Sequence, residues 1–566
     1  MEKRWLVKDI PARAQVELLS KAININMYLA AILLQRGVTD FDDAKNFFRP
    51  SLEALHDPFL MRDMDRAIDR LRQAIESGEK ILIYGDYDVD GTTAVSLVFS
   101  YLRTFYANCE VYIPDRYAEG YGISLTGIEW ADEHGYTLII ALDCGIKSAE
   151  LVNVAKRKGI DFIICDHHLP DDSIPDAVAV LDPKRKDCSY PYKELSGCGI
   201  GFKLMQAYAR RHRKEQELHE YLDLVAVSIA SDIVPITGEN RILAHFGLRK
   251  LNEDPNPGLK ALKEIAAIRN DLDVSGIVFT LGPRINAAGR VAHARTAVDL
   301  LIAETEEAAN DLAEKVNLKN EVRKQFDSDI TEEAIAMIEG NESLRAAKST
   351  VLFKNTWHKG VIGIVAARCV EKFYRPTVIL TESNNKITGS ARSVNGFDLY
   401  NAILECSDLL EKFGGHKYAA GLTLDINNLE LFQRKFEEVV SSTITEEMLT
   451  PVIDIDIPIH FDIISTKFMN VLKQMAPFGP ENPKPVFIAS NVYAFNSLSS
   501  FKDRHVRFLA AQSGSENIFH AVGFDFIEHY SRLANRDPFK MAFTIEENTF
   551  NGTTSIQLRI KDIKFL

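Results

Sequence analysis

Three kinds of hydrophobic pattern follow one another along the chain. In the first, short apolar runs alternate with amphipathic segments at about 92–104, 124–134 and 148–157. The apolar runs cover residues 81–84, 110–113, 137–142, 161–165 and 177–181. Strands that alternate with helices predict a parallel, doubly wound α/β sheet. Such sheets bind their ligands at the carboxyl ends of the strands.

The second pattern is a long polar stretch with a narrow apolar stripe. Between Arg290 and Glu339 the sequence has neither Gly nor Pro and is rich in helix formers. It predicts a helix of roughly 50 Å that bridges two domains, with a possible break near Asp327. A further α/β pattern follows at about 345–445.

In the third pattern, short alternating segments are separated by turns over the C-terminal residues, which predicts a small all-β barrel, and the OB-fold is the natural candidate. The expected domains are an N-terminal helical collar (1–75), the sheet domain (76–300), the connecting helix (301–342), the second α/β domain (343–447) and the barrel (448–566).

Composition narrows the class of protein. The 566 residues contain 46% hydrophobic residues, but no apolar run is long enough to span a membrane, and the N-terminus lacks the apolar region of a secretory signal. Seven scattered cysteines without a C-x-x-C pair suggest reduced thiols in a cytoplasmic protein rather than a zinc module. The net charge of -14 does not exclude a nucleic-acid partner, because a local basic groove suffices to bind phosphates.

Potential metal ligands follow three of the predicted strands and one apolar helix. They are Asp86, Asp88 and Asp90 after the first strand, Asp143 after 137–142, Asp166, His167 and His168 after 161–165, and Asp232 after the helix LDLVAVSIAS. A single D-x-D-x-D-G segment is equally compatible with an acidic surface turn. Several such strand ends at one edge favour a cation that relieves the repulsion between the carboxylates.

The type of ligand indicates the metal and the chemistry. Carboxylates with one or two imidazoles and no thiolate favour Mn²⁺ or Mg²⁺ over Zn²⁺. Near these motifs the sequence has no Ser-His-Asp or Cys-His nucleophile set, and the chain has no phosphate-binding loop of the ATPase type. Hydrolysis by a metal-activated water is therefore the expected mechanism.

Basic and glycine-rich segments are candidate phosphate contacts. Arg116 lies in the loop 114–122, and Arg284, Asn286 and Arg290 lie in a glycine-rich segment that we expect to be a loop. In the second α/β domain, Ser390 and Arg392 follow a predicted strand, and Gly415 and His416 lie in the loop FGGHKYAAG. For the Arg116 loop the alternative is an ordinary turn with a surface arginine, and for the segment of Arg284, Asn286 and Arg290 it is a structural turn with salt bridges.

The segments GDYDVDGTTA, LDCGI, DHH and SIASDIVP resemble the four motifs of the DHH phosphoesterases, and the downstream segments are similar to the RecJ branch of that family. The resemblance implies two divalent cations, Mn²⁺ or Mg²⁺, between a DHH domain and a DHHA1 domain, with a C-terminal OB-fold that binds single strands. It implies 5′→3′ degradation of single-stranded DNA to 5′-mononucleotides in repair and recombination. It also implies a RecQ-type helicase and a single-strand-binding protein as partners.

The resemblance also assigns roles to residues. The expected metal ligands are Asp88, Asp90, Asp143, His167 and Asp232, with Asp143 bridging the cations and Asp86 binding directly or through water. Asp143, Asp166 and His168 are the expected catalytic residues, and His168 would contact the scissile phosphate. Arg116, Ser390 and Arg392 would hold the 5′ end, and the loop of Gly415 and His416 the nucleotide being cleaved. Many family members have a histidine where this chain has Tyr84, which puts the outer metal in doubt.

Two alternatives remain open at this point. A DHH hydrolase of short oligonucleotides or cyclic dinucleotides would share the metal motifs, but it would need neither the long helix nor the barrel. A non-catalytic DHH replication scaffold would not need the full set of acidic and histidine residues. We expect a monomer.

Overall fold

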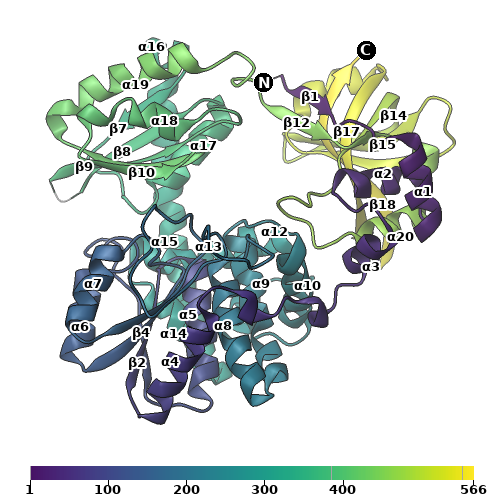
Figure 1. Ribbon diagram of the computed structural model, residues 1–566. Helices are drawn as coiled ribbons and strands as arrows, with labels where there is room; N and C mark the ends of the chain where they lie inside the picture. Colours follow the sequence, from purple (N-terminus) through teal and green to yellow (C-terminus); the bar gives the residue numbers. More distant parts are fainter. Residues whose placement is uncertain (1, 384, 551) are drawn as a thin grey trace. The chain divides into compact units, whose positions relative to one another are not determined.

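The computed structural model describes residues 2–383, 385–550 and 552–566, which form two compact units (Figure 1). One unit comprises Leu318–Ile453 together with the start of the chain up to Leu6, and the other comprises Val7–Asn317 and Asp454–Leu566. Each unit has its own hydrophobic cores.

The larger unit contains the predicted parallel sheet, with strand order β3-β2-β4-β5-β6. The strands are β2 (Lys80–Gly85), β3 (Cys109–Tyr112), β4 (Tyr136–Leu142), β5 (Asp161–Cys165) and β6 (Ala179–Leu181). All neighbouring pairs are parallel. The doubly wound fold predicted from the apolar runs is confirmed.

Helices cover both faces of this sheet (Figure 1). One face packs against α4 (Met64–Glu76), α5 (Val89–Arg103), α8 (Gly197–His212) and α9 (Leu222–Ser231). The other packs against α6 (Leu125–Glu133) and α7 (Ala149–Arg157). Because α9 is buried on nearly all sides, its sequence is apolar all round rather than amphipathic. Further helices of this domain are α10 (Gly238–Glu253), α11 (Pro257–Ile265) and α14 (Arg295–Leu301).

The N-terminal helices differ from the expected collar, because they divide between two cores. The helix α4 packs on the sheet domain, whereas α1 (Arg13–Ile23), α2 (Met27–Gln35) and α3 (Phe41–Phe48) share a core with the barrel. The middle of α2 is apolar and fully buried there, so it requires a hydrophobic partner surface. Among the described residues no single helix is long and apolar enough to cross a membrane; only α1 and α2 together, bent by 109°, reach that length and composition.

The glycine-rich segment before the connecting helix is helical, so the expected loop is wrong. It consists of α12 (Val274–Gly276), a π-helical turn (Ile277–Leu281) and α13 (Gly282–Val291). The glycines allow close packing instead of a turn. A Cβ atom at Gly289 would lie 2.8 Å from the carbonyl oxygen of Tyr87, so glycine allows α13 to pack closely against residues 86–90, called the aspartate loop below.

The connecting helix α15 (Glu306–Glu339) is continuous, and the possible break near Asp327 does not occur. Asp327 is buried and accepts two hydrogen bonds of 2.7 Å from Arg368 on α17 (Ile362–Phe373). A bidentate pair of this kind fixes the C-terminal half of α15 to α17.

The smaller unit contains a mixed sheet with strand order β10-β11-β9-β8-β7. Its strands are β7 (Thr350–Phe353), β8 (Thr377–Ser383), β9 (Lys386–Arg392), β10 (Lys412–His416) and β11 (Ala419–Leu424). The helix α17 covers one face, and α18 (Leu399–Leu404) and α19 (Leu429–Thr443) cover the other. Two local expectations change: Ser390 and Arg392 lie within a strand, and the segment around His416 is a hairpin.

The C-terminal residues form the predicted barrel. Six strands follow the order β13-β14-β15-β16-β18-β17, and pairing of β14 with β17 closes the sheet. They are β13 (Ile457–Pro458), β14 (Phe487–Phe501), β15 (His505–Gln512), β16 (Ile518–Gly523), β17 (Phe539–Phe550) and β18 (Thr553–Phe565). The helix α20 (Thr466–Gln474) packs in the same core as the N-terminal helices.

Candidate active site

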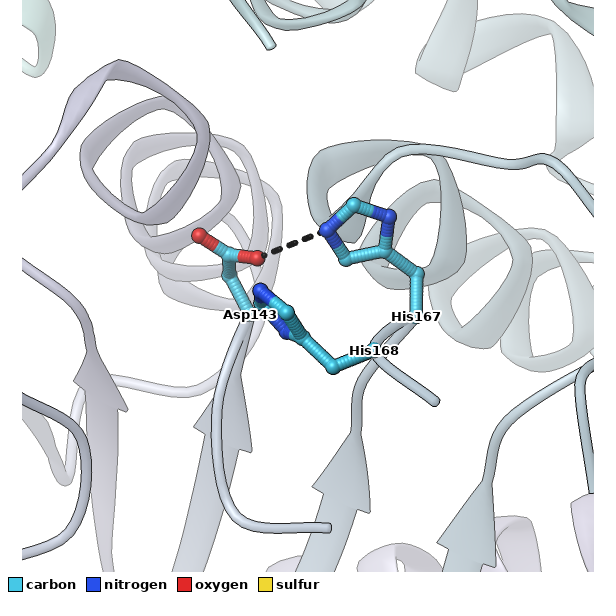
Figure 2. Close-up of side chains that lie close together, drawn as sticks. All are labelled: Asp143, His167 and His168. Atoms are coloured by element: carbon cyan, nitrogen blue, oxygen red, sulfur yellow. Dashed lines mark ion pairs between the residues drawn. The ribbon is translucent and has the colours of Figure 1, made fainter. Parts of the chain in front are cut away.

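The strand ends bring the predicted acidic and histidine residues together in the larger unit. The ring nitrogen Nε2 of His167 lies 3.2 Å from Asp143 Oδ1, 3.5 Å from Asp232 Oδ2 and 3.7 Å from Asp90 Oδ2. Figure 2 shows Asp143 and His167 pointing toward each other from neighbouring strand ends, with His168 beside them. Asp143 adopts a left-handed backbone conformation (φ 59°), which aspartate tolerates better than most residues.

Several polar atoms at this point are buried without a hydrogen-bond partner in the described part of the chain. They are Oδ2 of Asp86, Oδ1 of Asp143 and both ring nitrogens of His167. Leaving such groups unpaired costs about 1–3 kcal/mol each. Burial lowers the pKa of His167, so its ring is neutral and the short distances to the carboxylates are not salt bridges. A neutral imidazole with free nitrogens among carboxylates is suited to bind a cation.

The carboxyl groups repel one another in the absence of a cation. Burial, together with the charge of Asp90, raises the pKa of Asp143 well above its usual range and that of Asp232 to about 8. Burial and the charge of Asp88 likewise raise the pKa of Asp86. Oxygen ligands around one imidazole match the preferences of Mn²⁺ and Mg²⁺, so these residues fit the expected metal.

Two groups of three side chains have ligand atoms within 4.8 Å of one another: Asp143 with His167 and His168, and Asp90 with His167 and Asp232. The groups share His167. Asp86 and Asp88 belong to neither of them, and Asp88 caps α5 by accepting a 3.1 Å hydrogen bond from the backbone N–H of Gly91.

Asp90 is held by a distant part of the chain. Its carboxylate accepts hydrogen bonds from the backbone N–H groups of Gly197 (2.6 Å) and Cys198 (2.8 Å) and from the Ser228 hydroxyl (2.6 Å). The two N–H groups belong to the N-terminus of α8, where the helix dipole favours negative charge. These three hydrogen bonds therefore fix the position of the Asp90 carboxylate.

Asp166 contacts His168 and belongs to neither of the two groups of possible metal ligands. It accepts a 2.7 Å hydrogen bond from Nδ1 of His168 and backbone N–H bonds from Ile146 and His167. Burial acts to raise the pKa of Asp166, but the hydrogen bond and charge of His168 outweigh it and bring the pKa to about 2. Nε2 of His168 lies 3.2 Å from the hydroxyl of Tyr121, so both ring nitrogens have partners.

Tyr84 packs in the core that the sheet shares with α6 and α7. Its ring is buried and stacks on Tyr112, and its hydroxyl donates to the carbonyl of Gly122 (3.0 Å) and accepts from the N–H of Ser124 (3.1 Å). The tyrosine therefore anchors the loop 122–124 and occupies no ligand position.

A second candidate site lies in the smaller unit, at the start of α17. Arg392 on β9 is largely buried, and burial lowers the pKa of its guanidinium. In the described part of the chain it has no carboxylate partner, and its hydrogen bonds go to Ser390 Oγ (3.3 Å) and the carbonyl of Ala391 (2.8 Å). A Cβ atom at Gly363 would lie 2.8 Å from Ser390 Oγ, so glycine lets the helix N-terminus approach both residues.

Small residues extend this site across the sheet. His416 pairs with Ala419 on β11, and Ala419 pairs with Arg392 on β9, so these three side chains share one face. Gly421 lies beside Ser390 on the same face, and Gly414 lies beside Gly421. Neither glycine has a close neighbour where a side chain would project, so the face is open next to the arginine.

The remaining predicted phosphate contacts differ in how they relate to the segment of Asp86, Asp88 and Asp90. The guanidinium of Arg116 lies 4.8 Å from the ring centre of Tyr87 in the aspartate loop, and its charge acts against the rise in the pKa of Asp86. The carbonyl of Arg290 accepts a hydrogen bond from Tyr117 of the Arg116 loop. Arg284 instead donates to Asn317 at 3.1 Å, and Asn286 is half-buried on α13.

Comparison with known proteins agrees with this geometry. Three family models match the chain: the DHH family N-terminal domain at residues 80–229, the DHHA1 domain at 346–442 and the RecJ OB domain at 455–562. The single-stranded-DNA-specific exonuclease RecJ of Bacillus subtilis is 35% identical over 563 residues, which are 99% of this chain and 70% of that protein. The RecJ of Salmonella typhimurium is 32% identical, over 88% of this chain and 90% of that protein.

This chain belongs to the RecJ family of single-stranded-DNA-specific exonucleases. The crystal structure of RecJ in complex with Mn²⁺ from Thermus thermophilus superposes with a TM-score of 0.85 at 25% identity, covering 99% of this chain and 79% of that one. A second structure of that protein is a complex with Mg²⁺. The predictions of fold class, metal-dependent exonuclease activity on single-stranded DNA and a divalent cation are thereby confirmed.

Several further residues near this site were not predicted from the sequence. Asp182 follows β6 directly, as Asp143 and Asp166 follow their strands; it is fully buried, and burial raises its pKa to about 7. Tyr121 lies within the loop examined for Arg116, but its bond to His168 has no sequence signal. Ser228, which holds Asp90, lies four residues before Asp232 in the noted motif.

Proposed function

We propose that the chain removes 5′-mononucleotides from the 5′ end of single-stranded DNA in repair and recombination. The observation that carries this proposal is His167, a neutral imidazole without a hydrogen-bond partner in the described residues, within 3.2–3.7 Å of three carboxylates. Such an arrangement is costly in a folded protein unless a cation occupies it.

In this proposal one set of residues binds the cations and another contacts the scissile phosphate. Asp88, Asp90, Asp143, His167 and Asp232 hold two cations, Mn²⁺ or Mg²⁺, with Asp86 as a further ligand directly or through water. Two cations bound there would lower the pKa of a water and stabilise the attacking and leaving oxygens of an in-line displacement. Asp143 would be a ligand of both cations. His168 contacts the scissile phosphate, and Asp166 orients its ring and favours its charged form through the 2.7 Å hydrogen bond.

The direction of degradation rests on the second site. A half-buried arginine with no carboxylate partner among the described residues, a serine hydroxyl and a helix N-terminus match a terminal phosphate. We assign the 5′ phosphate to Arg392 and Ser390. The open face next to them, with His416 and the adjoining backbone of Gly415, receives the nucleotide being cleaved. Arg116, Arg284, Asn286 and Arg290 contact the backbone of the strand.

The domains follow the same division. Residues 76–300 hold the cations, 343–447 bind the 5′ end and 448–566 hold the strand that follows. We further propose a monomeric cytoplasmic protein that acts with a RecQ-type helicase and a single-strand-binding protein. The seven cysteines, all free and buried, suit a reducing compartment.

The test uses end-labelled single- and double-stranded DNA with Mn²⁺, Mg²⁺ or EDTA. Release of mononucleotides from the 5′ end of single strands, abolished by EDTA, is the expected result. Asp143→Ala should abolish turnover while DNA binding persists. The matched control is Asp176→Ala, because Asp176 is an exposed carboxylate paired with Lys156. Equal attack on duplex, or cleavage of dinucleotides alone, would contradict the proposal and favour a hydrolase of short substrates.

A further inference from the structure

Ile233 combines two features that are unfavourable for an isoleucine. Its backbone is left-handed (φ 59°), and 62% of the residue is exposed to solvent. A β-branched residue in this conformation is a genuine outlier with a strained backbone. The position directly after the helix end, where α9 is followed by Asp232, is usually occupied by glycine or asparagine in this conformation.

The location of this outlier is the rim of the metal centre. Ile233 follows Asp232, whose carboxylate lies 3.5 Å from Nε2 of His167. Consecutive Cα atoms are only about 3.8 Å apart, so the isoleucine side chain starts within one residue of a ligand. A second apolar side chain, Leu169, is 61% exposed and follows His168 directly. An acidic centre is therefore bordered by exposed aliphatic groups.

Neither folding nor the turn explains an isoleucine here. The turn could be made by asparagine, as it is at the end of α1, where Asn24 has the same left-handed conformation. The hydrophobic contacts of this segment are made by Val234 and Ile236, which are buried in the core. The strained residue adds an apolar surface that faces solvent.

We propose that Ile233 contacts the base of an unpaired nucleotide held at the metal centre, an inference that rests on the proposed function. The phosphates of the strand are attracted by cations, but the acidic ligands around them offer an uncharged base no favourable partner. An aliphatic side chain makes van der Waals contact with the face of any base, so the contact tolerates every sequence. Leu169 extends the same apolar rim.

The experiment is a double-mutant cycle between Ile233 and the base. Wild type, Ile233→Asn and Ile233→Gly would each degrade 5′-phosphorylated single strands that carry a normal nucleotide or an abasic site at the first, second or third position. Both replacements keep the left-handed turn and remove the apolar side chain. We expect roughly five- to tenfold lower kcat/KM on normal strands and no loss on strands abasic at the contacted position.

Stability separates this role from a structural one. Because the replacements relieve backbone strain, Tm should rise by about 1–3 °C while activity falls. The matched control is Ala267→Gly, which relieves a left-handed residue (φ 53°) at an exposed position after α11 and should leave activity unchanged. The Mn²⁺ concentration for half-maximal activity should also stay unchanged.

The possible failures are distinguishable. If wild type does not degrade single strands, the proposed function itself fails. If wild type is active but the loss in the Ile233 variants is the same on abasic and normal strands at all three positions, the base contact is refuted. A lower Tm or a weaker response to Mn²⁺ in both variants would likewise refute it, since Ile233 would then support the fold or Asp232.

Discussion

Replacing Asp143 by asparagine should stabilise the metal-free protein while destroying its response to metal. Asn is nearly isosteric with Asp and tolerates the left-handed backbone at this position. The substitution removes one of the buried like charges, which come from Asp88, Asp90 and Asp232 as well as from Asp143. It also removes an oxygen that has no hydrogen-bond partner in the described residues.

The size of the effect follows from the repulsion. Two like charges 4 Å apart repel by about 4 kcal/mol at an effective dielectric constant of 20. Protonation of the coupled carboxyl groups relieves part of this, because their pKa values are raised, so a net gain on the order of 2 kcal/mol remains near pH 8. For a domain of about 150–250 residues a gain of that size corresponds to roughly 4–8 °C in Tm. Mn²⁺ at a hundred times its Kd should stabilise wild type by about 2.7 kcal/mol.

The assay is thermal unfolding near pH 8 after treatment with EDTA, repeated with Mn²⁺. The variant should unfold at a higher temperature than wild type in EDTA, gain little from Mn²⁺ and lack nuclease activity. The control is Asp223→Asn, another buried carboxyl with a raised pKa, whose oxygens accept hydrogen bonds from the backbone N–H groups of Leu224 and Asn256. It should keep the Mn²⁺ response.

Two outcomes would refute the reasoning. A lower Tm of Asp143→Asn in EDTA would mean that the carboxylate makes favourable structural interactions that outweigh its repulsion. An undiminished gain from Mn²⁺ in the variant would mean that Asp143 is not a ligand.

Three further predictions follow from the same contacts. Metal-free wild type should lose stability as pH rises from about 4 to about 8. A carboxyl whose pKa is raised in the folded state, such as that of Asp232, binds its proton more tightly there than in the unfolded chain. A free energy of unfolding in urea that rises with pH over this range would contradict the prediction. Arg392→Gln should lower kcat/KM on 5′-phosphorylated strands by roughly 10- to 100-fold, with only small effects on Tm and on the activity toward strands with a 5′ hydroxyl. Equal losses of kcat/KM on both substrates would argue against a phosphate contact. Tyr84→Phe should lower the free energy of unfolding in urea by about 1–2 kcal/mol, because the hydrogen bonds to Gly122 and Ser124 are lost. The number of bound Mn²⁺ ions, measured by elemental analysis, should stay unchanged. Fewer bound cations would place Tyr84 at the metal site.

The sequence by itself determined the sheet domain and the candidate ligands. The apolar runs have lengths and spacings that only a parallel sheet accommodates, and carboxyl ends of parallel strands meet at one edge. Residues directly after those runs, such as Asp143 and His167, therefore had to lie close together. Asp182, directly after the last strand of this sheet, follows the same rule.

Local pattern was less informative where glycine was involved. The glycines of residues 282–289 predict a loop, but they lie in a helix. There Gly289 allows α13 to approach the backbone of Tyr87 closely. The glycines around His416 belong to a hairpin that leaves one face of a sheet open. A missing side chain permits both turns and close contacts, and only the neighbouring elements distinguish the two.

Only the tertiary structure decided how each ligand is held. Asp90 is fixed by partners 107, 108 and 138 residues away, and such contacts leave no periodic signal in the chain. The direction of Tyr84, the packing of α1–α3 with the barrel and the exposure of strained Ile233 are also set by distant neighbours. Hydrophobic periodicity determines which face of an element is buried, whereas the partner that covers it depends on packing between elements far apart in sequence.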